Sequence, residues 1–346
     1  MPQTLHKILV IRNDKLGDFT LALPTFFLLK ASLPECQLTA LVPAYTRDIA
    51  ELCPAIDHIL LDPGTVADRS EQRALLQHIR EQHFDAALTL FSTTRIGWLL
   101  WRSGIPHRVA PATKLAQVFY NHRITQRRSH SLKPEYQYNL DLAGSLLETF
   151  SITPSNTPPP PYLQLESSKV AAVRQQFCQQ YQLDPQALTV FLHPGHGGSA
   201  NNLSAEQYAS LANKISCSHP LNVIVSAGPG ESDHAQRVKQ AITRHTPCLY
   251  ESRDGLSDFV HHIAFADLFI SGSTGPLHVA GALNRPTCGF YPIRRSATSL
   301  RWQTLNDDER RLAFSPPPQT DVDDMSSLDI DQAAQAISQL LASLAN

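Results

Sequence analysis

The chain has 346 residues, of which 42% are hydrophobic and 17% charged, and its formal net charge is −2. This composition supplies enough apolar material for packed cores and excludes a disordered chain, while the length favours two domains over one. No apolar run approaches the roughly 20 residues that span a bilayer, and the N-terminal pattern is not that of an export signal. We therefore expect a cytoplasmic protein, and nothing in the composition indicates a nucleic-acid partner. The six cysteines form no CxxC pair, which favours reduced core thiols over a disulfide framework or a zinc site.

The first part of the chain alternates strand-length apolar segments with segments of helical period, which is typical of a parallel sheet with crossover helices. We expect strands at residues 7–12, 37–42, 58–61 and 85–91, and helices near residues 25–32, 68–83 and 136–150. The pattern predicts a first α/β domain over residues 1–156. It ends at a tract with four consecutive prolines, which cannot continue a helix or a central strand, so residues 157–163 are expected to be a linker.

The same alternation then restarts and predicts a second α/β domain over residues 164–325. We expect its strands at residues 188–193, 222–226, 267–271 and 287–291, and its helices near residues 204–217, 231–245 and 276–283. The last segment, residues 326–346, contains an amphipathic helix from about residue 328 to residue 344, which could pack onto either domain.

A long stretch without acidic residues stands out in the first domain. From Ala86 to Pro134 there is no Asp or Glu, whereas the stretch carries eight cations interleaved with aromatic residues. These cations are Arg95, Arg102, Arg108, Lys114, Arg123, Arg127, Arg128 and Lys133. Such a charge bias favours a surface that meets an anionic molecule, although a solvated basic surface is the plainer alternative.

The loop after the first strand carries an acid in a position suited to catalysis. In open α/β sheets, ligands bind at the carboxyl ends of the strands. Residues 12–18 follow the first strand, contain one glycine, and so lack the glycine pattern of a dinucleotide site. Asp18 opens the next helix and is a candidate general base toward a hydroxyl group. The alternative is that Asp18 only caps that helix.

Three loops of the second domain are candidates for binding a diphosphate. Residues 193–202 hold three glycines that could present backbone N–H groups to an anion, and Ser204 with Gln207 has capping-box spacing. The two histidines of this loop are weak evidence for a metal site. Residues 228–233 set Glu231 at a helix start, where it could simply complement the helix dipole. Residues 271–278 place hydroxyl groups and glycines before Pro276, so a helix N-terminus should face the diphosphate.

Taken in order, these loops make the chain resemble glycosyltransferase family 9, the bacterial heptosyltransferases, over essentially its whole length. The resemblance rests on Arg12 and Asp18 followed by Pro24, on the HPG-x-GGSA loop with Leu203 and Ser204, on residues 228–231, and on residues 273–278. It implies the GT-B fold, in which two Rossmann-like domains face across a cleft. It also implies transfer of heptose from ADP-heptose to the inner core of lipopolysaccharide.

The resemblance further assigns roles to individual residues. Asp18 matches the family's catalytic base. The residues expected to bind the donor are Ser199, Asn201, Glu231, Ser273, Thr274, Gly275 and His278. Two positions depart from the family pattern: Asn201 and Asn202 stand where a Lys or Arg is common, and Ser273 stands where many members have Asp. The first departure removes a cation that would neutralise the leaving diphosphate, so the helix dipole together with another basic residue would have to supply that charge.

The basic stretch suits an acidic acceptor such as a phosphorylated, Kdo-bearing lipid A, with Arg123, Arg127 and Arg128 expected to bind it and with peripheral contact at the inner membrane. The reaction implied is a direct displacement with inversion at the anomeric carbon, without a metal or other cofactor. The D-x-D spacings at residues 321–323 and 329–331 are expected to lie away from the sheet loops. Two alternatives stay open: a GT-B nucleotide-sugar epimerase, and a catalytically silent protein that binds a nucleotide or glycan.

Overall fold

The computed structural model describes residues 5–113, 115–195, 197–198 and 201–345. Its contacts divide the chain into two compact units, the first containing residues 1–128 and 133–163 and the second residues 129–132 and 164–346. Within the described residues, the strands form two six-stranded sheets, one in each unit, and every strand pairing is parallel. The predicted α/β class is therefore confirmed. None of the described helices is long and apolar enough to cross a membrane.

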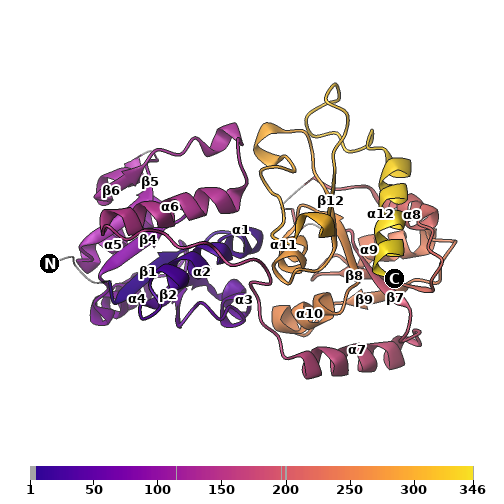
Figure 1. Ribbon diagram of the computed structural model, residues 1–346, viewed down its shortest axis with the longest axis horizontal. Coiled ribbons are helices and arrows are strands. Elements are labelled where there is room, and N and C mark those ends of the chain that lie inside the picture. The colour runs from indigo at the N-terminus through magenta and orange to yellow at the C-terminus, as the bar shows by residue number, and fades with distance from the viewer. Residues whose placement is uncertain (1–4, 114, 196, 199–200, 346) are drawn as a thin grey trace. The chain divides into compact units, whose positions relative to one another are not determined.

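The sheet of the first unit has the strand order β3-β2-β1-β4-β5-β6 (Figure 1). Its strands are β1 (Lys7–Ile11), β2 (Gln37–Pro43), β3 (His58–Asp62), β4 (Ala86–Thr89), β5 (His107–Pro111) and β6 (His122–Ile124). The helices that connect and cover them are α1 (Leu16–Thr20), α2 (Leu23–Ser32), α3 (Arg47–Glu51), α4 (Arg69–Gln82), α5 (Thr94–Ser103) and α6 (Glu135–Thr149), with the 3₁₀ helix η2 (Leu115–Phe119) between β5 and β6.

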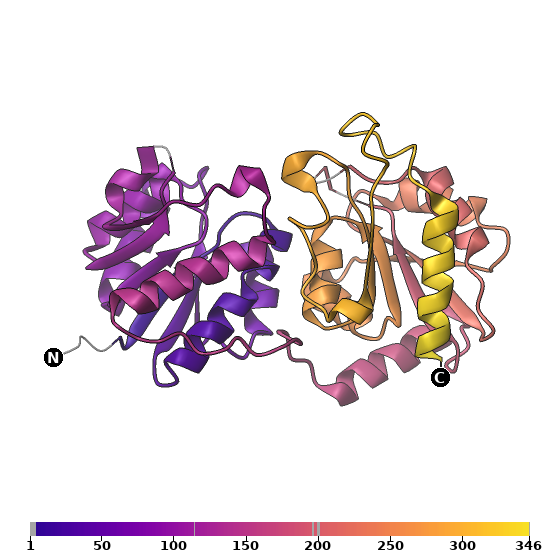
Figure 2. The same ribbon diagram turned by 45° about the horizontal axis from the view of Figure 1, so that its top comes forward.

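Helices cover both faces of this sheet. Leu9 and Ile11 of β1 are fully buried in a core that they share with Ile79 of α4 and Leu99 of α5. On the other face α2 and α6 pack side by side (Figure 2). Since successive side chains of a strand point to opposite faces, each strand contributes to both layers, which explains its nearly continuous apolar sequence.

The sheet of the second unit has the strand order β12-β11-β10-β7-β8-β9. Its strands are β7 (Leu188–His193), β8 (Leu221–Ala227), β9 (Cys248–Glu251), β10 (Leu268–Gly272), β11 (Thr287–Phe290) and β12 (Arg311–Phe314). Its helices are α7 (Ser167–Tyr181), α8 (Ala205–Lys214), α9 (Ser232–Ala241), α10 (Gly255–Ala264), α11 (Gly275–Ala282) and α12 (Ile330–Leu344). Counted from the first strand of each unit, both sheets have the doubly wound 3-2-1-4-5-6 order.

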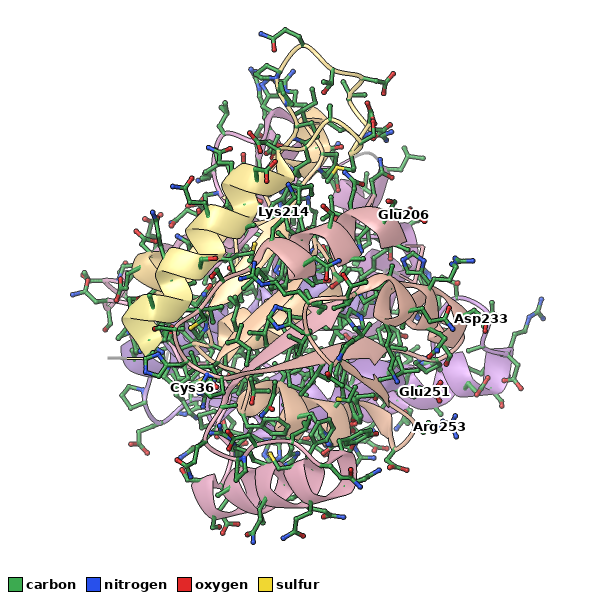
Figure 3. The ribbon with its side chains drawn as sticks, turned by 90° about the vertical axis from the view of Figure 1, so that its right-hand side faces the viewer. Cys36, Glu206, Lys214, Asp233, Glu251 and Arg253 are labelled. Carbon is green, nitrogen blue, oxygen red and sulfur yellow. The ribbon has the colours of Figure 1, made fainter. Side chains whose placement is uncertain are left out.

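The two faces of the second sheet are filled by different kinds of side chains. Val190 and Leu192 of β7 join an aliphatic core with α8, α9 and α12. Phe191 points the other way and packs against Phe177 of α7 and Phe265, the C-cap of α10, at ring distances of 6.3 and 5.7 Å. The C-terminal helix α12 therefore belongs to the second unit, where it lies along α8 and its Asp331 pairs with Lys214 (Figure 3).

The end of the proline tract is attached to the first unit. Tyr162 is buried and packs edge-on against Phe27 of α2, with ring centroids 5.1 Å apart. The described contacts place the division at Leu163. The role of residues 157–163 as a linker stays a prediction.

Several elements were absent from the sequence-based prediction. They are α3, α5, α7, α10, β5, β6, β9 and β12. Signals for α5 were present, because Thr93 caps its start by accepting a hydrogen bond from the N–H of Ile96, and Gly104 ends it in the left-handed conformation. The edge strands β6, β9 and β12 are short, and short strands carry little periodic signal.

Candidate active site

In each sheet, the connections that follow one pair of neighbouring strands leave in opposite directions. Ligands of doubly wound sheets bind beside this pair, at the carboxyl ends of its strands. In the first unit the pair is β1 and β4, and in the second unit it is β7 and β10. The loop after β1 contains Arg12, Asp14 and Asp18, and the loop after β10 contains Ser273 and Thr274. Most of the residues singled out in the sequence thus follow strands of these two pairs.

Asp18 is held by a buried arginine. The guanidinium of Arg12 donates to Asp14 through Nε, at 2.7 Å, and to Oδ1 of Asp18 through Nη2, at 2.5 Å. Arg12 is 2% exposed, whereas the carboxyl side chains of Asp14 and Asp18 are each 15% exposed. No hydrogen bond to the second carboxyl oxygen of Asp18 is found among the described residues. That oxygen is thus available to take a proton.

A second cation and a third acid complete this cluster from α6. Oε1 of the buried Glu135 accepts from Nη1 of Arg12 at 2.9 Å and from Nη1 of Arg128 at 2.6 Å. Asn139, one turn further along α6, accepts from both arginines at 3.2 and 3.4 Å. Arg128 was predicted to bind an acceptor from an exposed surface, and it is instead half-buried and bound to Glu135. Three ion pairs, running through Glu135 and Arg12, connect it to Asp18.

Burial raises the pKa of Asp18 from 3.8 to about 6, and the nearby carboxylates of Asp14 and Glu135 also raise it, while the ion pair with Arg12 lowers it. A carboxyl group with this pKa is ionised at neutral pH and is still basic enough to accept a proton from a polarised hydroxyl. The alternative role as a helix cap is wrong. The N-cap of α1 is Lys15, no side chain caps this helix, and the Asp18 side chain is directed to Arg12.

The acid-free stretch is partly neutralised by acids from elsewhere in the fold. Arg95 pairs with the buried Asp62 at the end of β3, and Lys133 pairs with Asp141 of α6. Arg108 donates to backbone carbonyl groups, including that of Phe119 at 2.8 Å. The expectation of a uniformly uncompensated basic face is therefore wrong. Arg123 and Arg127 differ, since both are exposed and neither forms an ion pair with a described residue. Lys114 lies outside the described residues.

In the second unit, the glycine loop after β7 is built around Glu231. Its carboxylate accepts from the N–H of Gly197 at 2.8 Å and from that of Gly228 at 3.1 Å. A side chain at Gly195 would collide with it, because a Cβ there would lie 1.8 Å from Oε2 of Glu231. The N–H of Gly197 was expected to meet a phosphate, and it instead binds an acid of the chain itself. Ser199 lies outside the described residues.

The loop after β10 forms a helix start of the predicted kind. Thr274 is the N-cap of α11, and Pro276 occupies the first turn. The Thr274 hydroxyl lies 3.0 Å from that of Ser271, so the cap position is fixed by buried hydroxyl groups. Gly275 begins the helix and leaves its N–H without an intrahelical partner. Ser273 is half-buried and precedes this turn.

His278 lies one turn into α11 and is 2% exposed. Burial lowers its pKa to about 4, so the imidazole is neutral at physiological pH. Its Nδ1 finds no hydrogen-bond partner among the described side chains and backbone. A buried ring nitrogen without a partner is costly unless a ligand satisfies it, which is consistent with a binding role for His278.

The histidine at the end of β7 is buried and bonded within the second unit. His193 is buried, its Nδ1 lies 3.0 Å from the hydroxyl of Ser226, and burial lowers its pKa to about 4. His196, its proposed partner for a metal, lies outside the described residues. Among the residues that the structure does describe, no group of three or more His, Cys, Asp or Glu side chains could hold a metal ion.

Comparison with known proteins decides the family. The model of glycosyltransferase family 9 (heptosyltransferase) matches residues 72–325. The chain belongs to glycosyltransferase family 9. It is a glycosyltransferase with the GT-B fold, and the resemblance in its loops is confirmed at the level of the family. Membership decides against the nucleotide-sugar epimerase.

The relatives of this family-9 chain include proteins whose names specify lipopolysaccharide and one whose name specifies no substrate. It is 47% identical, over 90% of each chain, to a Haemophilus influenzae protein assigned only provisionally as a glycosyltransferase. It is 23% identical, over 82% of each chain, to lipopolysaccharide heptosyltransferase 2 of Escherichia coli. The solved structure of E. coli ADP-heptose lps heptosyltransferase II superposes with a TM-score of 0.75 at 20% identity, covering 98% of each chain.

The loop before α8 is linked to an arginine from another loop through one carboxylate. Asn201 donates to the carboxylate of Asp323 at 3.0 Å, and the same carboxylate holds Arg294 through two contacts, one from Nε at 2.7 Å. Arg294 follows β11, and its guanidinium therefore lies close to Asn201. Asp323 was expected to lie away from the sheet loops, and that expectation is wrong. Asn202 is structural, since its Oδ1 accepts from the hydroxyl of Tyr208 at 2.7 Å.

Sequence reasoning missed Glu135, Asn139 and Arg294 as members of these clusters, and it treated Arg12 only as part of a motif. Glu135 is 123 positions from Arg12, and only the placement of α6 against the sheet brings the two together. One signal was available: Glu135 is the first acid after the long acid-free stretch and stands at a helix start. For Arg294 and Asp323 the sequence offers no comparable signal.

Proposed function

We propose that this protein is an inverting, metal-independent heptosyltransferase that transfers heptose from ADP-heptose to an anionic inner-core acceptor of lipopolysaccharide. The proposal is supported by family membership and by relatives whose names specify ADP-heptose and lipopolysaccharide. The single observation that carries the chemistry is the half-buried Asp18 carboxylate, fixed by Arg12, with a pKa of about 6.

Asp18 acts as the general base. Arg12 engages Oδ1 and fixes the orientation of the carboxylate, which leaves the other oxygen to accept the proton of an acceptor hydroxyl. As that proton moves to Asp18, the hydroxyl oxygen forms a bond to the anomeric carbon of the donor. The bond from this carbon to the diphosphate oxygen breaks, and its electron pair leaves with the nucleoside diphosphate. Attack from the side opposite the leaving group inverts the anomeric configuration.

The second unit stabilises the leaving diphosphate. The N-terminus of α11 offers the N–H of Gly275 and the positive end of the helix dipole, and Thr274 adds a hydroxyl group. His278 contributes a hydrogen bond from a neutral ring rather than a charge. Arg294, which is paired with Asp323 beside Asn201, is the candidate for the cation absent at Asn201. Glu231, Ser273 and Ser199 complete the donor-binding set.

The first unit binds the acceptor. Arg123 and Arg127 are exposed cations that attract phosphate and carboxylate groups of the acceptor. Arg128 is bound to Glu135 and therefore acts by connecting this basic segment to the cluster around Asp18.

A transfer assay tests the proposal. Purified protein is incubated with ADP-heptose and a Kdo-bearing, phosphorylated lipid A, with inner-core acceptors that carry zero or one heptose compared in parallel. We expect one heptose to be added, with inverted anomeric configuration in the nuclear magnetic resonance spectrum of the product. The rate in excess EDTA should match the rate without it.

Thermal stability measured with a panel of nucleoside diphosphates and their sugars identifies the donor independently of the acceptor. A ligand at about 100 times its dissociation constant stabilises the native state by about 2.7 kcal/mol. ADP-heptose and ADP should give the largest shifts. Stabilisation by another nucleotide sugar, with none by ADP compounds, would overturn the donor assignment, and loss of transfer on chelation with recovery in Mg²⁺ would overturn metal independence.

A further inference from the structure

Four large apolar side chains are exposed on two neighbouring elements of the first unit. Trp98 and Trp101 of α5 are 44% and 51% exposed, and Leu115 and Val118 of η2 are 78% and 67% exposed. Both pairs are three residues apart, so each pair lies on one side of its helix. We call these four residues the α5–η2 patch. Neither Asp18 chemistry nor donor binding uses them.

Helices α5 and η2, which carry the patch, pack closely against each other. Phe119 of η2 packs against Trp101 with ring centroids 6.3 Å apart, and Gly97 of α5 lets the two helices approach closely. A Cβ at Gly97 would lie 3.0 Å from Phe119 and 3.3 Å from the carbonyl oxygen of Ala116. On its inner side α5 buries Ile96, Leu99 and Leu100 in the core. The exposed side chains are therefore held on a fixed platform.

Cations surround the patch. Arg102 is exposed in the last turn of α5. Arg80 of α4 donates to the carbonyl oxygen of Arg102 at 2.7 Å, which places its guanidinium at the end of α5. Arg73 lies two turns earlier on the same side of α4 and is exposed. The exposed Arg123 follows η2 on the edge strand β6.

The neighbouring helix α4 also carries acids. Glu71 accepts from the backbone N–H of Asp68 in the cap of α4, and Glu81 accepts from the side chain of Gln77. Neither α5 nor η2 contains an acid, because both lie inside the acid-free stretch from Ala86 to Pro134. The described residues of α5 and η2 therefore bring only positive charge to the patch, whereas on α4 the arginines stand beside Glu71 and Glu81.

We propose that the α5–η2 patch docks this protein onto an anionic lipid bilayer. Tryptophan is the side chain that settles best at the boundary between headgroups and acyl chains, and arginines beside it meet the lipid phosphates. Leucine and valine supply further apolar area. Because α5 begins at the carboxyl edge of the sheet, docking holds that edge near the membrane surface. This inference does not depend on which sugar is transferred.

Tryptophan fluorescence tests the docking directly, because the chain has three tryptophans and two belong to the patch. The W302F variant keeps only Trp98 and Trp101. We expect its emission to shift to shorter wavelength when vesicles of phosphatidylcholine and phosphatidylglycerol are added, and to be quenched by brominated acyl chains. Vesicles of phosphatidylcholine alone should produce much weaker binding. An unchanged spectrum with anionic vesicles would overturn the proposal.

Vesicle flotation separates the contributions of the residues. W98S/W101S should weaken binding by roughly a factor of ten or more, since the apolar area is lost. Among the described residues, the ring contact with Phe119 is made by Trp101, so W98S alone keeps this contact and serves as the test if the double variant is unstable. Arg102→Gln should weaken binding about fivefold. Val322→Ser, at a valine that is 50% exposed in the second unit, is the matched control and should bind as the wild type does.

Binding of a second copy of the chain to the patch, in place of a membrane, can be told apart experimentally. If the patch joins two copies of the chain, W98S/W101S would change the oligomeric state in size-exclusion chromatography while vesicle binding stayed at the wild-type level. That outcome would overturn membrane docking, as would equal binding to neutral and anionic vesicles.

Discussion

At the scale of single residues, the proposed chemistry depends on the raised pKa of the Asp18 carboxyl group. Asp18 is surrounded by Arg12, Asp14 and Glu135, and its burial outweighs the ion pair with Arg12, so its pKa rises to about 6. Glu135 is 1% exposed and cannot touch an acceptor, although its charge contributes to that pKa. Exposure therefore decides that Asp18 rather than Glu135 can meet a substrate, while the charge of Glu135 acts on the pKa of Asp18.

The pH dependence of turnover follows from the pKa of Asp18. A general base acts in its deprotonated form, so kcat/KM should be high at neutral pH and fall as the pH decreases through about 6. The check is a pH–rate profile measured with saturating acceptor and limiting donor. A profile that stays flat down to pH 4.5 would show that no group with this pKa is required.

Glu135→Gln tests the positioning and electrostatic role of Glu135. Because the charge of Glu135 raises the pKa of Asp18, its removal should move the acid limb of the profile to lower pH. Asp141→Asn is the matched control, since Asp141 is on the same helix and pairs with Lys133 rather than Arg12. A structural role alone would lower stability and leave the limb in place.

At the scale of elements, the positions of the candidate residues were largely predictable. Apolar runs gave β1 and β7, helical period gave α4, and Pro276 after a glycine-rich turn gave α11; the rule that ligands bind at strand ends then selected the loops. The partners of the loop residues were not predictable, because they come from other elements: Glu135 reaches Arg12 across 123 positions. The charge of the acid-free stretch was overestimated for the same reason, since Asp62, Glu135 and Asp141 neutralise part of it only in the folded chain.

The basic segment from β6 to η3 (Arg128–His130) separates into two functions that mutation can distinguish. R123E/R127E should raise the acceptor KM several-fold and leave donor affinity unchanged, and most of the salt dependence of acceptor binding should disappear. Arg128→Glu should instead lower stability, because it adds a fourth carboxylate to the cluster of Asp14, Asp18 and Glu135. Identical acceptor kinetics for R123E/R127E and the wild type across a salt series would contradict an acceptor role.

The segment after β11 supplies the proposed compensating cation. Arg294→Gln should raise the donor KM about tenfold, the scale of one lost charge-assisted hydrogen bond, and spare the acceptor KM. Lys214→Gln removes a cation at the far end of α8 and is the control. Adding Asn201→Lys to the Arg294→Gln variant should restore donor affinity. Equal donor KM values in all variants would leave the helix dipole as the whole source of positive charge.

At the scale of the whole molecule, the chain repeats one strand order in two units and assigns a different task to each. The candidate base and the candidate acceptor residues belong to the first unit, and the candidate donor residues belong to the second. Donor binding and proton abstraction should therefore be separable by substitution, which would not hold if both relied on the same loops.

The most direct measurement compares Asp18→Asn with the wild type in donor affinity and turnover together. Asparagine keeps the size of the side chain and can still accept from Arg12, so the fold and the ADP-heptose dissociation constant should remain near wild-type values. Turnover should fall by a factor on the order of 10² to 10⁴, the scale of a lost general base. Asp14→Asn, at the other acid paired with Arg12, should lose far less. Turnover of Asp18→Asn at the wild-type level would contradict the assignment of Asp18 as the base.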